Sequence, residues 1–132
     1  MQATSGGALY RRATFLLDSI GQRVMSEHID IDEDPLVRKG KGSAAFDDEG
    51  VRTCARRNLD AGVVQHYFLS TYSARKLGLK TTGHAGGSQN LKLSSRLTRP
   101  GDHLDEMLRK LGRGLFVTEL MGQGVNLSLI HI

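Results

Sequence analysis

The chain has 132 residues, 39% of them hydrophobic and 24% charged, which is typical of one globular domain with a core and excludes a disordered chain. The formal net charge of +4 comes from scattered basic residues, without the basic stripe or stacking aromatics of most nucleic-acid binders. Cys54 is the single cysteine, so an internal disulfide and a multi-cysteine zinc site are excluded. A lone cysteine, no signal-peptide hydrophobic region and no apolar run near the roughly 20 residues of a membrane span predict a cytoplasmic protein.

The first third of the chain predicts a helix, a strand and a long loop. Apolar residues recur at three- and four-residue spacing over Ala8–Met25, which predicts an amphipathic helix that Ser5 or Thr4 could cap. His28–Asp32 alternates apolar and acidic residues, as a half-buried strand does, and its acidic surroundings favour a solvated edge strand. Leu36–Gly50 then predicts a polar loop, with Phe46 as its anchor.

The middle of the chain predicts a β-hairpin followed by a short helix. Val51–Leu59 and Val63–Leu69 read as strands joined by a turn at Asp60-Ala61-Gly62. Ser70 is placed to cap a helix that runs through Lys76 and stops at Gly78.

A glycine-rich loop follows, and it is the stretch most suggestive of function. Loops this rich in glycine usually need positive φ angles or a close backbone approach, and loops carry function more often than the elements that hold them. Its candidate residues for touching a substrate or partner are Thr82, Gly83, His84, Gly86, Gly87 and Asn90.

The last third predicts a strand, a helix and a strand that could form one crossover. Gln89–Leu93 alternates and should return to the sheet, and Leu115–Leu120 should form a further strand. Between them Asp102–Leu111 predicts an amphipathic helix with Asp102 as N-cap and a Leu/Met stripe in the core. A tight glycine turn is expected at 121–124. The whole is therefore expected to be α+β and strand-rich, with an N-terminal helix, a short helix after the hairpin and an amphipathic helix near the C-terminus.

Four segments in register carry a family resemblance. They read SGGALYRRATFLLDSIGQRV, FDDEGVRT, LSTYSARKLGLKTTGHAGGSQNL and GLFVTELMGQGVN. Together they resemble the TldD/PmbA family of cytoplasmic metalloproteases, and more closely its PmbA (TldE) branch, over about Ser5–Asn126. The resemblance implies that residues 1–126 are part of a larger C-terminal domain, hence an incomplete domain. The sequence from Leu127 to Ile132 departs from the family and resembles translated adapter sequence, so we expect residues 127–132 to be a non-native tail.

The resemblance also bears on metal and partners. It implies that TldD-branch members hold zinc through a His-Glu-x-x-x-His helix and a later cysteine, which by register would lie at or before residue 1 and beyond residue 132. The PmbA branch is implied to lack this motif and to pair with a zinc-holding TldD-type subunit. We therefore expect no metal site and no catalytic residue in this chain, zinc in a TldD-type partner, and a heterodimer or homodimer that acts on peptides.

Three features admit a structural and a functional interpretation. His84 has no second histidine at helical spacing. A role as a zinc ligand is therefore less favoured than a role as a loop residue that hydrogen-bonds to the backbone. Asp47-Asp48-Glu49 lacks the spacing of a calcium loop and favours a turn that caps nearby amides. Cys54 is expected to be a small buried residue in a strand.

Three classes of function are open from the sequence. The first is a fragment of a PmbA-type subunit in a metalloprotease complex, which shapes the cleft and the subunit interface. The second is a non-catalytic interaction or dimerisation module. The third, a DNA-gyrase-modulator type of regulator, depends only on positive charge and on the family's older description.

Overall fold

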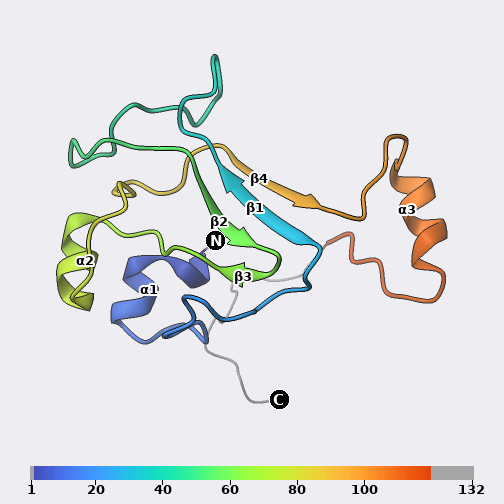
Figure 1. Ribbon diagram of the computed structural model, residues 1–132, viewed down its shortest axis with the longest axis horizontal. Helices are drawn as coiled ribbons and strands as arrows, with labels where there is room; N and C mark the ends of the chain where they lie inside the picture. The colour runs from blue at the N-terminus through green and yellow to red at the C-terminus, as the bar shows by residue number, and fades with distance from the viewer. Residues whose placement is uncertain (1, 120–132) are drawn as a thin grey trace.

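The computed structural model describes residues 2–119, which form one antiparallel sheet with helices at two of its ends (Figure 1). The elements in chain order are η1 (Gln2–Thr4), α1 (Gly6–Tyr10), β1 (Ile29–Glu33), β2 (Arg56–Asp60), β3 (Val63–Val64), α2 (Thr71–Leu77), β4 (Leu91–Ser95) and α3 (Leu104–Leu111). This confirms the predicted α+β class. None of the helices within residues 2–119 is both long enough and apolar enough to cross a bilayer.

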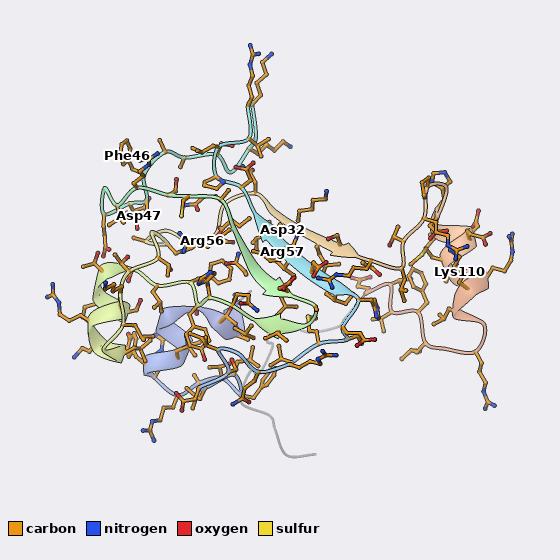
Figure 2. All side chains as sticks on the ribbon, in the orientation of Figure 1. Asp32, Phe46, Asp47, Arg56, Arg57 and Lys110 are labelled. Atoms are coloured by element: carbon orange, nitrogen blue, oxygen red, sulfur yellow. The ribbon has the colours of Figure 1, made fainter. Side chains whose placement is uncertain are left out.

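The sheet has the strand order β3-β2-β1-β4, and every neighbouring pair is antiparallel. β1 therefore lies in the centre, and the prediction that it is a solvated edge strand is wrong. Two of its acidic residues have cationic partners. Asp32 lies 2.7 Å from Arg57 on β2 (Figure 2), and the buried Asp30 lies 2.8 Å from Arg96, just beyond β4. Paired in this way, the carboxylates are tolerated inside a sheet where unpaired ones would be costly.

The predicted hairpin is confirmed, with shorter strands than expected. Asp60 pairs with Val63, so the turn consists of Ala61 and Gly62, which have φ angles of 49° and 76°. Two successive positive φ values match the twist of a tight hairpin turn. Gly62 is needed there, because a Cβ at this position would lie 2.1 Å from the carbonyl oxygen of Met25.

The predicted helix over Ala8–Met25 is wrong beyond its first three residues. Ser5 does cap α1 by accepting a hydrogen bond from the backbone N–H of Ala8, but the helix ends at Tyr10. Arg12 and Asp18 have φ angles of 55° and 54°, which a right-handed helix cannot accommodate. The segment instead runs irregularly along the sheet.

Tertiary contacts hold this irregular segment in place. The hydroxyl of Tyr67 donates to the carbonyl of Leu16 at 3.0 Å and accepts from the backbone N–H of Ser19 at 2.7 Å. Packing and hydrogen bonding to distant residues have thus overridden the helical periodicity.

The core lies between the sheet and the two helices α1 and α2. Its buried members are Leu9, Ile31, Leu59, Val64, Tyr67, Leu69 and Ala74. α1 lies against α2, where a Cβ on Gly6 would meet the Ser73 side chain at 2.1 Å and Tyr10 makes an edge contact with Tyr72 at 5.8 Å. This contact places the start of the chain beside the short helix that precedes the glycine-rich loop.

The C-terminal part differs most from prediction. α3 projects from the end of the sheet opposite α1 and α2 (Figure 1), and its stripe of Leu104, Met107, Leu108 and Leu111 is exposed, so its predicted place in the core is wrong. The N-cap is His103, because the Asp102 carboxylate bonds to Lys110 and to the backbone N–H of Arg99 instead.

The predicted strand Leu115–Leu120 and the crossover are wrong over residues 115–119, which are not in a strand and leave Leu115 85% exposed. The turn expected at 121–124 and the tail 127–132 lie outside the described residues.

Two further predictions for single residues are wrong. Phe46 is 61% exposed and points away from the body (Figure 2), so it does not anchor the long loop. Cys54 is exposed and precedes β2, and its sulfur accepts a hydrogen bond from Nη2 of Arg56 at 2.8 Å. The long loop is held instead by its buried residue Asp47, which accepts a hydrogen bond from the backbone of Ala85. The thiol of Cys54 is not part of the core.

Candidate functional site

The glycine-rich loop is held at both ends by predictable elements. α2 begins at the N-cap Ser70, whose hydroxyl accepts from the backbone N–H of Ser73, and ends at Gly78 with a φ angle of 68°. β4, whose predicted strand is confirmed with a shift of two residues, begins at Leu91. The loop between them runs back across the end of the sheet, near the last residue of β1.

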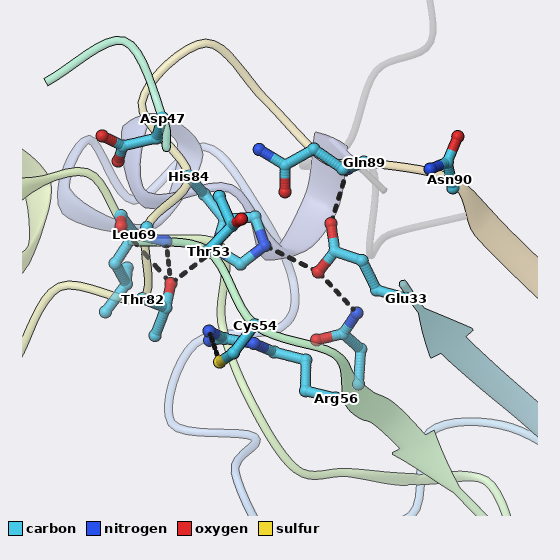
Figure 3. Close-up of polar contacts among 12 residues, drawn as sticks. Glu33, Asp47, Thr53, Cys54, Arg56, Leu69, Thr82, His84, Gln89 and Asn90 are labelled. Carbon is cyan, nitrogen blue, oxygen red and sulfur yellow. Dashed lines mark hydrogen bonds and ion pairs between the residues drawn. The ribbon is translucent and has the colours of Figure 1, made fainter. Parts of the chain in front are cut away.

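His84 points into the protein and joins the loop to β1 (Figure 3). Its Nε2 lies 2.7 Å from a carboxylate oxygen of Glu33, and its Nδ1 lies 2.8 Å from the hydroxyl of Thr82. The side chains of His84 and Glu33 are only 2% and 1% exposed. Because an ionised carboxylate can only accept hydrogen bonds, Nε2 of His84 is protonated and donates a hydrogen bond to Glu33.

Glu33 is a buried carboxylate with three donors. Besides His84, the backbone N–H of Gln89 donates at 2.6 Å and the side-chain amide of Asn58 donates at 3.3 Å. Burial disfavours the ionised form, but these three hydrogen bonds outweigh it and hold the pKa of Glu33 below its ordinary value. The carboxylate therefore carries its charge at neutral pH and joins β1 to β2 and to two points of the glycine-rich loop.

Thr82 completes the array on the other side of the imidazole. Its Oγ1 accepts from the backbone N–H of Leu69 at 2.7 Å and lies 3.0 Å from the carbonyl oxygen of Tyr67. The ring of His84 also makes an edge contact with Phe68, at 4.7 Å between centroids. The loop is thereby fastened to the strand-like stretch that leads into α2.

A second attachment joins the loop to the acidic turn at 47–50. The Asp47 carboxylate accepts hydrogen bonds from the backbone N–H groups of Glu49 and Val51 in its own turn. It also accepts one from the backbone N–H of Ala85 in the glycine-rich loop, at 3.0 Å. Burial opposes ionisation, but these hydrogen bonds outweigh it and lower the pKa of Asp47. The predicted role of this acidic run as a turn that caps nearby amides is confirmed.

Glycine is required where the loop passes this turn. Gly86 has a φ angle of 90°, and a Cβ there would lie 2.3 Å from the carboxylate of Asp48. Gly83, with a φ angle of 72°, would place a Cβ 3.0 Å from the carbonyl of Arg52. The positive φ angles of both residues, and the close approach of Gly83 to the backbone of Arg52, explain the glycines, as predicted. Gly87 lies beside them at an exposed position.

Asn90 forms the third attachment. Its side-chain N–H groups donate to the carbonyl of Asp34 at 2.9 Å and to the hydroxyl of Ser43 at 2.7 Å, while its oxygen accepts from the backbone N–H of Gly42 at 2.9 Å. Asn90 also has a positive φ of 42°, a conformation that asparagine tolerates better than most residues. It ties the long polar loop to the start of β4.

Glu33, His84 and Thr82 together have the composition of a catalytic triad, but their geometry is that of a structural hydrogen-bond network. The imidazole is buried and both of its nitrogens are engaged, and the hydroxyl is surrounded by backbone groups of the chain itself. Within residues 2–119, no three His, Cys, Asp or Glu side chains form a group that could hold a metal ion. Of the six candidate residues, Thr82, His84 and Asn90 thus point toward the protein, and Gly86 and Gly87 lie at an exposed turn. Contact of these residues with a substrate or partner stays a prediction.

Glu33 was missed from the sequence because it belongs to an acidic run that favours a solvated strand. A signal was present in the alternation of β1, since Ile29, Ile31 and Glu33 share one face of the strand. Because Glu33 occupies the next position on the buried face of β1, its carboxylate requires a buried hydrogen-bond partner. Nothing in the sequence identifies that partner as His84, which lies 51 residues further on.

Comparisons with known proteins agree with this architecture. Residues 1–129 match the model of the PmbA/TldA metallopeptidase C-terminal domain. The chain is 48% identical to the metalloprotease PmbA of Escherichia coli O157:H7 over 124 residues, which cover 94% of this chain and 27% of that protein. The chain therefore spans about a quarter of the length of this relative.

Two solved structures share the fold. A protein from Thermotoga maritima, named as a candidate modulator of a DNA gyrase, superposes with a TM-score of 0.68 at 29% identity, covering 85% of this chain and 26% of its own. TldE from Thermococcus kodakarensis superposes with a TM-score of 0.57 at 26% identity, covering 70% of this chain and 22% of its own. The chain belongs to the PmbA/TldD metallopeptidase family and corresponds to part of that family's C-terminal domain.

Proposed function

We propose that this chain is part of a PmbA-type subunit of a TldD/PmbA metalloprotease complex that acts in the proteolysis of peptides and unfolded proteins. In this proposal it shapes the cleft and the subunit interface, while zinc is held by a TldD-type partner subunit. The observation that carries the proposal is that the polar side chains of the glycine-rich loop point into the protein. Thr82, His84 and Asn90 fasten the backbone, so the loop offers a shaped wall and exposed glycines to a neighbour.

The interface part of the proposal is supported by α3. Its apolar stripe is exposed, with Leu104 at 57% and Met107 at 47%, and the helix projects from the sheet (Figure 1). An amphipathic helix normally buries such a stripe against another element. A subunit interface would supply that element. We further propose a cytoplasmic location, on the ground of the lone cysteine, Cys54.

The test is complex formation with a TldD-type protein from the same genome. The chain, carrying an affinity tag, is co-expressed with that protein, and the eluate is assayed for both chains, for zinc and for peptide cleavage. We expect a complex in which zinc and cleavage require the TldD-type chain. Leu108→Lys, on the apolar stripe, should weaken the complex, whereas Asp105→Lys, on the same helix and also exposed, serves as the matched control.

Two outcomes would contradict the proposal. Stoichiometric, tightly bound zinc in the chain alone would place the metal here. Peptide cleavage by the purified chain alone would make it the catalytic unit.

The interaction-module alternative has one observation in its favour. Among the described strands β4 pairs only with β1, so its outer edge is open, and Leu93 on it is 63% exposed. An open edge can add a strand from another chain through main-chain hydrogen bonds. A complex that forms but never cleaves peptides under any partner combination would favour this alternative. The DNA-regulator alternative predicts DNA binding that weakens steeply with salt.

A further inference from the structure

A cleft of about 420 Å³ lies over three strands of the sheet, away from the glycine-rich loop. Its base is formed by the core residues Ile31, Leu59 and Val64, and its walls by η1 and by the irregular segment that replaces the predicted N-terminal helix. Cavities of this size with apolar linings are typical of small-ligand sites. Phe15 and Met25 line it while 53% and 45% exposed, so both side chains can change rotamer to admit a ligand.

Asn58 is the polar residue of this cleft whose hydrogen bonding is incomplete. It is 2% exposed, and its Nδ2 donates to Glu33, which fixes the orientation of the amide. Its Oδ1 is buried and has no hydrogen-bond partner among residues 2–119. Leaving a buried acceptor unpaired is costly, and native proteins rarely do so without a reason. A ligand that brings an N–H group would satisfy it.

His66 lines both the apolar cleft and a shallow polar depression on the surface beside it. That depression is lined by Arg56, Arg57, Asp60, Gln65 and His66. Partial burial, together with the positive charge of Arg56, lowers the pKa of His66 and so favours the uncharged imidazole. Apolar space beside neutral and charged hydrogen-bonding groups matches a peptide, in which an apolar side chain alternates with polar backbone.

We propose that the cleft binds an apolar residue of an extended peptide, whose backbone N–H donates to Oδ1 of Asn58. The inference rests on the proposed function, because it supplies the site at which a peptide in the complex would be held. Since Oδ1 is shielded from water, we expect Met25 or Phe15 to move as the peptide enters. The same amide then links the bound peptide, through Glu33, to the His84 attachment of the loop.

The test is a titration of the chain with N-acetyl-leucine methylamide, followed by methyl NMR. Saturable shifts are expected for Val64 and Leu59, which line the cleft, and not for Ala74, a core residue outside it. Methylating both amide nitrogens of this ligand removes both N–H donors and should weaken binding about tenfold, as expected for one lost hydrogen bond to a buried acceptor. This ligand-side change avoids a substitution of Asn58, which would also disturb Glu33.

A pair of variants checks the location. Ala3→Phe fills the cleft from η1 and should abolish the shifts, while Ala13→Phe, at an exposed position outside the cleft, should preserve them. Absence of saturable shifts, or equal binding of the N-methylated ligand, would overturn the inference. If the ligand does not bind but the chain still assembles with the TldD-type protein, only this inference fails and the proposed function stands.

Discussion

Replacing Glu33 by glutamine tests whether the buried carboxylate holds the loop. Glutamine has nearly the same shape but only one acceptor oxygen. In the protein one carboxylate oxygen receives His84 and Asn58, and the other receives the backbone N–H of Gln89. Whichever way the new amide is turned, its NH2 group faces a donor.

The expected loss follows from these contacts. At least one hydrogen bond to a charged group is removed, at a cost of about 1.5–3 kcal/mol, and the others become neutral hydrogen bonds, each weaker by about 1 kcal/mol. Breaking one partner of a buried pair typically costs about 3–5 kcal/mol in total. We therefore expect Glu33→Gln to lower the free energy of unfolding by about 3–5 kcal/mol, a large share of the total for a domain of this size.

The assay is urea unfolding at neutral pH, monitored by circular dichroism. Asp32→Asn is the matched control, because Asp32 lies in the same strand but forms a half-exposed ion pair with Arg57, which should contribute at most about 1 kcal/mol. Hydrogen exchange at Gln89 should also rise in Glu33→Gln. A loss below that of the control would refute the view that the Glu33 cluster fastens the loop.

Other measurements test separate parts of the structure. Asp30, with a pKa lowered to about 2, and Glu33, with a pKa below its ordinary 4.5, should contribute full stability above the unfolded-state values and lose it as pH falls through the folded ones. An acid titration should thus show stability declining below about pH 4.5, and a flat profile down to pH 2 would contradict both assignments. Gly62→Ala should cost at least about 2 kcal/mol, since the methyl group would lie 2.1 Å from the Met25 carbonyl and φ is 76°. Ser70→Ala should cost about 1 kcal/mol through loss of the α2 cap, measured by thermal unfolding; no change would mean that water replaces the cap.

Local signals in the sequence predicted some elements well. The hairpin, the helix after Ser70 and its stop at Gly78 depend on residues a few positions apart, so turn and cap preferences identify them. β1 was likewise visible in its alternation, but its central place was not. That place depends on Arg57 and Arg96, which neutralise its acids from 25 and 66 residues away.

The same distinction explains the errors at the two ends of the chain. Apolar periodicity over 8–25 fits a helix, yet Tyr67 fixes this segment in an irregular course from 48 residues away. The sequence correctly predicted that the apolar stripe of α3 lies on a helix, but wrongly predicted that the stripe is buried. Amphipathicity indicates that an apolar face requires a packing partner, but it does not identify that partner. At the candidate site, glycines and His84 were found from the sequence, whereas their anchor Glu33 was not.

The central position of β1 also has a kinetic consequence. β1 pairs with β4 across Ile29 and Ser95, so the strand cannot be completed until a chain segment synthesised some sixty residues later has arrived. Contacts of such long sequence separation slow folding, because loop closure must come before the interactions that reward it. Until β4 docks, Asp30 lacks its Arg96 partner and the outer side of β1 is open to other strands. The hairpin of β2 and β3, with its local turn, should form first and template β1, and β4 should be the last strand to gain protection in pulse-labelling hydrogen exchange.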